Sequence, residues 1–371
     1  MKIGILGTRG IPNNYGGFEQ FAEFFSIYAA QAEHSVFVYT PHNHTYKENT
    51  FEKVNLIKCY DPEYVIGTAG QFIYDLNCIL DSRKRNFDII LQLGYTSSAF
   101  WYDLHPKNSI VITNMDGLEW KRTKYNKPIK KLLKIAERMA ATKSDYLISD
   151  SLGIQEYLLK THNKESEYIA YGADNFDTPN EEFLNNYKVE KYNFNMIMAR
   201  FEPENNLNMV LEGVMLSKDE KPILVIGNHK TKYGDYLKNK FSTCKKIKFL
   251  GAIYNLTDLN NLRYFSNLYF HGHTVGGTNP SLLEAMASQG LIAAHRNQFN
   301  YGVLKENAFY FENSLDVKKI LETIKKIDNL QFVKNNSEAI ANNFNWNKIN
   351  DEYLQFFSKC LARNATGAKV K

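Results

Sequence analysis

The sequence predicts an α/β protein built from two doubly wound domains that face each other across a cleft. Short apolar runs recur along the 371 residues, and such runs are typical of strands buried on both faces of a parallel sheet. Segments with apolar residues at helical spacing separate these runs. The alternation stops at a polar stretch near the middle of the chain and then starts again. We therefore expect two sheets, each binding ligands at the carboxyl ends of its strands.

The first half contains six apolar runs of strand length, at residues 2–6, 35–39, 54–59, 88–93, 109–113 and 146–149. Helical spacing marks two helices in this half, at 18–32 and 70–85. The second half repeats the pattern with strands at 194–198, 222–226, 247–250, 268–271 and 291–294. Helices are expected at 204–216, 315–327 and 346–361, and the element at 276–288 is expected to begin with a glycine loop and to become helical at Pro280. Pro203 followed by Glu204 predicts the start of the first of these helices.

A polar stretch at 172–192, rich in Asn and Asp, separates the two halves and has the composition of a linker. We therefore expect a domain at 1–172, a linker at 173–192 and a second domain at 193–345. A final helix at 346–362 and a disordered tail at 363–371 complete the chain.

Composition excludes several classes of protein. The chain has 45 lysines and arginines against 40 aspartates and glutamates, a balance too even to predict nucleic-acid binding. No apolar run approaches the ~18 residues that span a bilayer, and the first residues lead directly into a strand pattern rather than a signal peptide. The four cysteines form no CxxC pair, so neither a disulfide framework nor a zinc site is expected. A soluble cytoplasmic protein fits these observations best.

The first strand is followed by a long glycine-rich loop, GTRGIPNNYGG, at 7–17. Its glycines do not have the GxGxxG spacing of a dinucleotide site, and no acid follows the second strand to hold a ribose, so an NAD site is not expected. Gly16 and Gly17 close the loop at a helix N-terminus, with Glu19 in the first turn. The length of the loop favours closure over a diphosphate or a sugar; the alternative is a plain strand–helix connection.

Two further loops carry polar side chains directly after predicted strands. Asn114, Asp116 and Glu119 follow the strand at 109–113, where Asp116 is a candidate for function. Glu119 is also placed to cap a helix or to pair with a neighbouring cation. Arg200 follows the first strand of the second half, and its guanidinium is suited to clamp a diphosphate. The alternative for Arg200 is a surface ion pair with Glu202 or Glu204.

The stretch GGTNPSLLEAM at 276–286 follows an apolar strand and opens a helix at Pro280. Glycines let a ligand approach the backbone, and the free N–H groups and dipole of a helix N-terminus favour an anion. Glu284 would then accept hydrogen bonds from a ribose diol. The alternative is an ordinary loop before an amphipathic helix.

His271 and His273 lie nearby without carboxylates or cysteines, so packing or substrate contact is expected rather than a metal site.

Residues 127–138 predict a basic amphipathic helix, in which five cations accompany an apolar face: Lys127, Lys130, Lys131, Lys134 and Arg138. Such a helix is suited to dock on an anionic membrane surface. A solvated charged face explains the same pattern equally well.

Taken together, these motifs resemble glycosyltransferase family 4, whose members have the GT-B fold of two Rossmann-like domains. The family's ADxIIxxS segment is similar to residues 144–151, its PxGxD segment to 170–174, and its GRxxPEKG segment to 199–206. The second acid of its ExxxxxxxE pair falls on Glu284. The finer patterns GTRGIPxxYGGFE, NxDGLEWKR, RxEPENN and GGTNPSLLEAM resemble bacterial rhamnosyltransferase-like enzymes of capsule, O-antigen or exopolysaccharide synthesis.

The resemblance implies retaining transfer of a sugar, with rhamnose as one candidate, from a nucleoside diphosphate sugar such as dTDP-rhamnose. No metal or other cofactor is implied. The acceptor would be a saccharide, plausibly lipid-linked, placing the protein in the cytoplasm or on the inner face of the cytoplasmic membrane. The final helix would cross back to the N-terminal, acceptor-binding domain. Acceptor-free turnover would instead indicate a sugar-nucleotide epimerase or hydrolase, and donor binding without transfer would indicate a non-catalytic nucleotide-sugar-binding subunit.

The resemblance also implies roles for particular residues. Catalytic roles are expected for Asp116, Arg200 and Glu284. Acceptor contacts are expected for Asn114, Asp116 and Glu119. Donor contacts are expected for Gly16, Gly17, Arg200, Asn205, Gly276, Gly277, Thr278, Asn279 and Glu284.

The chain departs from the family pattern at three positions. Gly276 replaces the first acid of the pair, Asn205 replaces the phosphate-binding lysine, and Met115 replaces the histidine before Asp116. The diphosphate is thus left to Arg200 and to backbone N–H groups of the glycine loop. Loss of an acid and a histidine beside the sugar suits a less hydroxylated donor, such as a 6-deoxyhexose.

Overall fold

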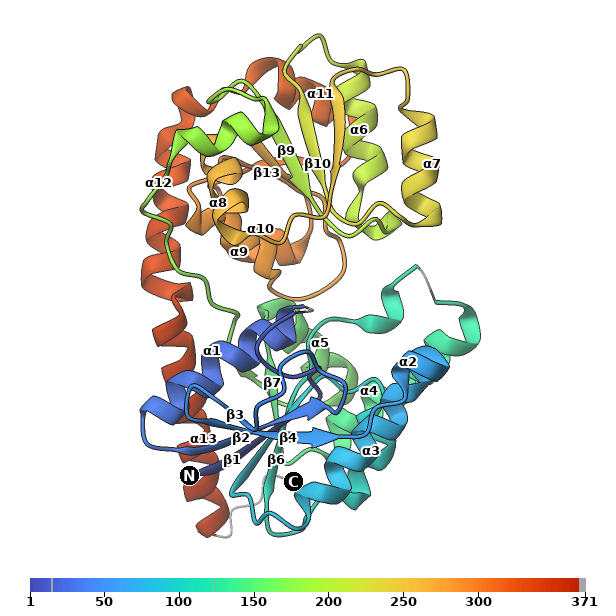
Figure 1. Ribbon diagram of the computed structural model, residues 1–371, viewed down its shortest axis with the longest axis vertical. Coiled ribbons are helices and arrows are strands. Elements are labelled where there is room, and N and C mark those ends of the chain that lie inside the picture. Colours follow the sequence, from blue (N-terminus) through green and yellow to red (C-terminus); the bar gives the residue numbers. More distant parts are fainter. Residues whose placement is uncertain (15, 124, 367–371) are drawn as a thin grey trace. The chain divides into compact units, whose positions relative to one another are not determined.

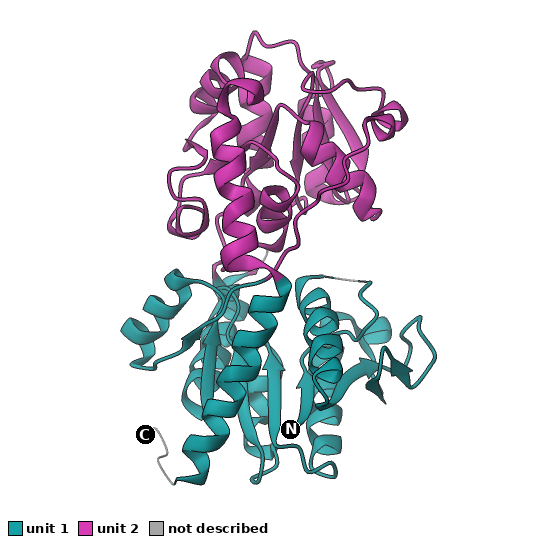
Figure 2. Ribbon diagram, turned by 90° about the vertical axis from the view of Figure 1, so that its left-hand side faces the viewer, with its two compact units in different colours: residues 1–120, 126–171, 346–371 teal, residues 121–125, 172–345 magenta. Residues whose placement is uncertain are grey.

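The computed structural model describes residues 1–14, 16–123 and 125–366. The chain divides into two compact units (Figure 2). Unit 1 comprises Met1–Trp120, Asn126–Tyr171 and the chain from Trp346 onward. Unit 2 comprises Gly172–Asn345 together with the short segment Lys121–Tyr125, which leaves unit 1 and returns to it.

Unit 1 is built on an eight-stranded sheet of order β3-β4-β2-β1-β5-β6-β7-β8 (Figure 1). All its described pairs are parallel except β3–β4, which is antiparallel. The strands are β1 (Lys2–Leu6), β2 (Ser35–Pro41), β3 (Thr50–Phe51), β4 (Val54–Cys59), β5 (Ile89–Leu93), β6 (Ile110–Asn114), β7 (Tyr146–Ser149) and β8 (Glu167–Tyr168). The order reverses between β1 and β5, so this is a doubly wound sheet.

The α-helices of unit 1 are α1 (Gly17–Gln31), α2 (Glu63–Ile66), α3 (Gly70–Ser82), α4 (Lys127–Lys143), α5 (Leu152–His162) and α13 (Trp346–Ala365). Aromatic side chains join the first helix to the last: the Phe21 and Tyr353 rings are 4.6 Å apart, and the Phe25 and Phe357 rings 5.7 Å. The last helix of the chain therefore packs in the unit formed by the first residues. It ends at Ala365 rather than at 362, because nothing in 363–365 breaks a helix. The rest of the expected tail, 367–371, lies outside the described residues.

Unit 2 is built on a six-stranded sheet of order β11-β10-β9-β12-β13-β14, and its described strand pairs are all parallel. Its strands are β9 (Asn195–Met198), β10 (Ile223–Ile226), β11 (Ile247–Gly251), β12 (Leu268–His271), β13 (Ile292–His295) and β14 (Phe309–Phe311). Its helices are α6 (Leu207–Leu216), α7 (Lys232–Lys240), α8 (Leu256–Phe265), α9 (Pro280–Ala287), α10 (Gln298–Leu304), α11 (Ser314–Thr323) and α12 (Leu330–Ala339). In chain order this sheet reads 3-2-1-4-5-6, and the order reverses between β9 and β12, where doubly wound sheets bind their ligands.

Three local expectations differ from the structure. The helix expected from residue 204 begins at Leu207, because Pro203–Asn205 forms a 3-10 turn and Asn206 adopts a left-handed φ of 52°. The helix expected at 315–327 ends at Thr323. The stretch 173–192 lies within unit 2 and contains a 3-10 helix, Glu181–Tyr187. Just before this helix, the backbone N–H of Asn180 donates to the Asn261 side chain of α8. Hydrogen bonds to a helix thus order a stretch with the composition of a linker.

The structure also bears on membrane insertion and cysteine chemistry. In the described part of the chain, no helix combines the length and apolar character needed to cross a bilayer. All four cysteines are free thiols.

Candidate functional site

Two loops of unit 2 lie side by side at the carboxyl ends of β9 and β12. These strands are hydrogen-bonded neighbours, with Met196 opposite Tyr269, so the loops that follow them emerge at the same edge of the sheet. The first loop is 199–206 and carries Arg200; the second is 272–279 and carries the glycines. The sequence placed both loops after strands, and the topology brings them together at the reversal point of the sheet.

Backbone hydrogen bonds fasten these two loops to each other. The backbone oxygen of Glu204 accepts from the Thr274 N–H at 3.2 Å and from the Thr274 hydroxyl at 2.8 Å. A Cβ on Gly272 would lie only 2.1 Å from the Asn205 oxygen, so glycine is needed for this approach. The Asn205 side chain is buried and donates to the Arg200 carbonyl at 2.8 Å. Asn205, predicted to bind the donor, therefore shapes the loop that presents Arg200.

Arg200 is exposed, and among the described residues it forms no ion pair and no side-chain hydrogen bond. The expected alternative, an ion pair with Glu202 or Glu204, is not formed. The Glu202 carboxylate instead lies 3.8 Å from the Arg122 guanidinium, and that of Glu204 accepts a hydrogen bond from Thr123. The guanidinium of Arg200 is thus available to an anion at the sheet edge.

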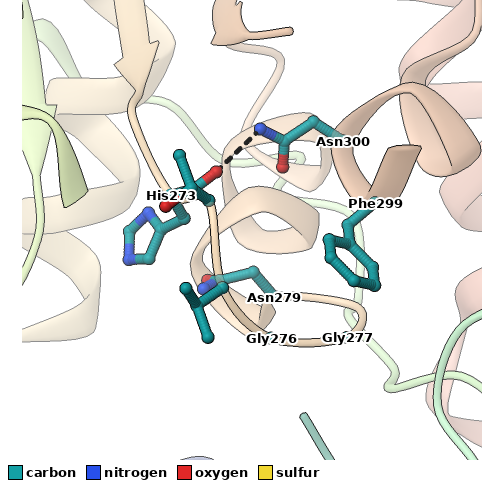
Figure 3. A pocket seen from close by; sticks show the side chains of 8 residues that line it. His273, Gly276, Gly277, Asn279, Phe299 and Asn300 are labelled. Carbon is teal, nitrogen blue, oxygen red and sulfur yellow. Dashed lines mark hydrogen bonds between the residues drawn. The ribbon is translucent and has the colours of Figure 1, made fainter. Parts of the chain in front are cut away.

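The glycine loop borders a small recess (Figure 3). The recess is lined by His273, Thr274, Val275, Gly276, Gly277, Asn279, Phe299 and Asn300. Gly276 has a φ of 126°, and a Cβ added there would meet nothing within 4 Å, so the space beside it is open. Asn279 caps α9 by accepting from the Ser281 N–H at 3.0 Å. The helix begins at Pro280 as the sequence predicted, and its N-terminus faces the same loop.

His271 and His273 stack with their ring centroids 4.4 Å apart. Burial, which has the largest effect, and the positive charges of Arg200 and Arg122 together lower the pKa of His273 to about 3. Burial likewise lowers the pKa of His271. Both imidazoles are therefore neutral at physiological pH. Only His273 lines the recess, and the described residues contain no cluster of three or more potential metal ligands.

Glu284 lies on α9 and pairs with a buried arginine that the sequence analysis missed. The Arg263 side chain is completely buried, and its Nη2 lies 2.5 Å from the Glu284 carboxylate, whose side chain is 20% exposed. Arg263 also donates from Nη1 to Asn260 at 3.0 Å, whereas its Nε has no hydrogen-bond partner. No sequence pattern marked this arginine, because the few apolar residues of α8 form no clear stripe; only the structure places Arg263 on the buried face of the helix with Leu259 and Leu262. A charged residue on a buried face requires a partner.

In unit 1, the loop after β6 is held in an unusual conformation. Asp116 adopts a left-handed φ of 47°, and its N–H donates to the Asn114 side chain at 3.0 Å. Asn114 is buried and donates in turn to the Tyr353 hydroxyl of α13 at 2.9 Å. Asn114, an expected acceptor contact, thus orients the loop that carries Asp116. Glu119 begins a one-turn 3-10 helix, Glu119–Lys121.

The glycine-rich loop after β1 ends at Gly16, and α1 begins at Gly17. Glu19, in the first turn, is buried and accepts from the Arg9 N–H at 2.8 Å and from the Thr8 hydroxyl at 3.3 Å. These bonds brace the start of the loop against the helix that follows it.

The basic helix predicted at 127–138 is the first part of α4, whose Leu133 and Ala136 are buried. On its exposed side Ile129, Leu132 and Ile135 are 39–45% exposed among the lysines. Apolar side chains thus accompany the cations on the accessible surface, a pattern that suits an anionic lipid surface as well as solvent.

Comparisons with known proteins place this geometry in context. A family described as a domain of unknown function (DUF1972) matches residues 1–174. No curated protein matches the chain. Sucrose-phosphate synthase from Thermosynechococcus elongatus has a similar structure, with a TM-score of 0.78 at 13% identity over 97% of this chain and 99% of that chain. HepE from Anabaena, solved with UDP, has a TM-score of 0.74 at 14% identity over 97% and 100% of the two chains.

A third similar structure is α,α-trehalose-6-phosphate synthase from Burkholderia multivorans, with a TM-score of 0.72 at 10% identity over 100% and 99% of the two chains. At such low identity, these likenesses concern the fold. They confirm the predicted fold class, an α/β protein with two domains built on parallel sheets. The chain therefore has the GT-B fold of these structures.

Proposed function

We propose that the protein is a retaining glycosyltransferase of family 4, similar to bacterial rhamnosyltransferases, that uses a nucleoside diphosphate sugar. The observation that carries this proposal is the position of Arg200. Its exposed guanidinium lies at the reversal point of a doubly wound sheet, beside a glycine loop that opens a helix. Positive charge, backbone N–H groups and a helix dipole together suit a diphosphate.

The leaving nucleoside diphosphate gains negative charge as the bond to the sugar breaks. Arg200 and the N–H groups of Gly277, Thr278 and Asn279 would stabilise that charge, so the proposed mechanism assigns no step to a metal. Glu284 would bind the ribose hydroxyls. Its carboxylate suits this role because Arg263, fully buried, holds it in one position.

The sugar would lie near Gly276, where the family places an acid. The open space beside this glycine and the absence of a carboxylate suit a sugar with one hydroxyl fewer. A 6-deoxyhexose such as rhamnose, carried by dTDP, is therefore the donor we propose to test first. HepE has been solved with UDP-glucose, so UDP-sugars are the second choice.

Asp116 is the proposed contact to the acceptor or to the transferred sugar, in a loop oriented by Asn114. The acceptor is proposed to be a lipid-linked saccharide of surface polysaccharide synthesis. The exposed lysines and apolar residues of α4 would then hold the enzyme on the inner face of the cytoplasmic membrane.

The proposal is tested by a thermal-shift screen against UDP, dTDP and GDP and their sugars, followed by transfer assays with and without saccharide acceptors. We expect one nucleoside diphosphate to stabilise the protein and sugar transfer to require an acceptor. Rapid donor conversion without an acceptor would indicate an epimerase or hydrolase instead. Donor binding with no transfer to any acceptor in the panel would favour a non-catalytic nucleotide-sugar-binding subunit.

A further inference from the structure

A short segment from the first half of the chain belongs structurally to the second unit. Lys121–Tyr125 is bounded on both sides by unit 1 yet groups with unit 2 (Figure 2). The contacts of its described residues include two to acidic side chains of that unit. The Thr123 hydroxyl donates to the Glu204 carboxylate, and the Arg122 guanidinium lies 3.8 Å from the Glu202 carboxylate. Both acids lie on the loop that carries Arg200.

These contacts place Arg122 beside the loop that carries Arg200. The backbone oxygen of Glu204 also accepts two hydrogen bonds from Thr274, the residue that follows His273. The charges of Arg122 and Arg200 both act on the His273 imidazole and lower its pKa. The Arg122 side chain is 14% exposed, so its charge is only partly screened by water. The charges of two guanidiniums thus both reach one buried, neutral imidazole that lines the recess.

The expected anion site is otherwise short of positive charge. A nucleoside diphosphate carries more than one negative charge, and Arg200 is the cation that the sequence motifs supply on the loop after β9. The residue at the family's lysine position, Asn205, is neutral, and its amide donates to the Arg200 carbonyl. A second cation near His273 would restore the balance of charge.

We propose that Arg122 is a second diphosphate-binding residue, acting with Arg200 on the donor. The inference rests on the proposed function and extends it, because it takes a donor-binding group from a motif in the first half of the sequence. The Glu202 carboxylate lies 3.8 Å from the guanidinium, and the five N–H donors of an arginine allow it to bind a phosphate oxygen as well.

The alternative is that Arg122 only attaches its segment to unit 2 through Glu202. The two roles predict opposite effects of Glu202→Gln. If the pair is only an attachment, Arg122→Ala and Glu202→Gln break the same contact and have the same effect. If Arg122 binds the diphosphate, Glu202→Gln removes a competing negative charge and leaves binding equal or tighter.

The experiment measures, by calorimetry, the binding of UDP, dTDP and GDP and of the corresponding nucleosides to the wild type and three variants. The variants are Arg122→Ala, Glu202→Gln and Lys121→Ala, the last removing one positive charge from an exposed neighbour. We expect Arg122→Ala to weaken the best nucleoside diphosphate by about tenfold or more, the effect of losing a hydrogen bond to a charged group. Binding of the nucleoside and the effect of Lys121→Ala should stay within about twofold of the wild type.

Equal weakening by Arg122→Ala and Glu202→Gln, or equal loss of nucleoside and diphosphate binding, would overturn the inference and leave the proposed function standing. The inference would also be overturned, with the proposed function left standing, if the wild type binds a nucleoside diphosphate and Arg122→Ala binds it equally well. If the wild type binds no nucleoside diphosphate, the proposed function fails, and this inference fails with it. Circular dichroism of each variant shows whether a loss of binding comes from unfolding.

Discussion

Replacing Glu284 by alanine should destabilise unit 2, whatever its effect on catalysis. The Arg263 side chain is completely buried, and Glu284 is the carboxylate that lies against it at 2.5 Å. Without Glu284 the guanidinium keeps its contacts to Asn260 and to the Met198 sulfur, neither of which carries an opposite charge. A buried charge that loses its partner costs ~3–5 kcal/mol. We expect the lower end, ~3 kcal/mol, because the Glu284 side chain is 20% exposed and water can replace part of the contact.

The three tryptophans make this effect measurable by unit. Trp101, Trp120 and Trp346 all lie in unit 1, so tryptophan fluorescence follows unit 1, whereas far-UV circular dichroism follows both units. For a unit of this size, ~3 kcal/mol lowers the melting temperature by about 6–12 °C. We therefore expect Glu284→Ala to produce an early transition in circular dichroism with little change in the fluorescence transition.

Two further variants separate the buried charge from other causes. Glu338→Ala is the matched control: it removes a glutamate of α12 whose side chain is 58% exposed, and a change below ~0.5 kcal/mol is expected. Arg263→Met combined with Glu284→Leu replaces both charges by apolar groups and should recover most of the lost stability. The reasoning is refuted if Glu284→Ala melts like the control, or if the double variant is no more stable than Glu284→Ala.

Three other predictions follow from the structure. Arg200→Ala should lower the rate of sugar transfer by about 100-fold or more, as loss of an oxyanion donor does, with the melting temperature unchanged because the side chain is exposed; normal turnover would remove Arg200 from the site. Burial raises the pKa of Asp75 from 3.8 to about 6, which corresponds to ~3 kcal/mol of folding free energy. Below pH ~4 the carboxyl is protonated in both the folded and the unfolded state, so this stability is present there and should be lost as the pH rises to ~6. Asp75→Asn should flatten that slope in denaturation followed by tryptophan fluorescence, and an unchanged slope would contradict the assignment. Replacing Lys130, Lys131 and Lys134 of α4 together by glutamine should weaken binding to anionic vesicles by on the order of 100-fold. Unchanged binding in vesicle sedimentation would contradict the membrane proposal.

The sequence was most informative where the structure is local. Buried strands such as β1 and β12 were placed to the residue, because a strand covered on both faces must be apolar throughout. The start of α9 was placed equally well, since Pro280 suits only the first turn of a helix. Two polar helices, α7 and α8, were not predicted, because their few apolar residues do not form a clear stripe.

The positions of candidate residues could be predicted from the sequence, whereas some of their roles could not. That Arg200 and the glycine loop each follow a strand could be derived from the sequence, because parallel strands deliver their carboxyl ends to one edge. Two other roles could not. Asn205 and Asn114 are polar residues in functional loops, yet their amides donate to neighbouring protein groups and shape the loops themselves. Residue type and position do not show which hydrogen bonds an amide will make.

What the sequence by itself determined is therefore the two parallel sheets and the loops at their binding edges. Only the tertiary structure decided which charges meet. Arg263 and Glu284 are 21 residues apart and pair across two helices, and Thr123 and Glu204 are 81 residues apart and join a segment of the first half to unit 2. Periodicity is a property of neighbouring residues, whereas the pairing of buried charges depends on where the folded chain brings distant residues together.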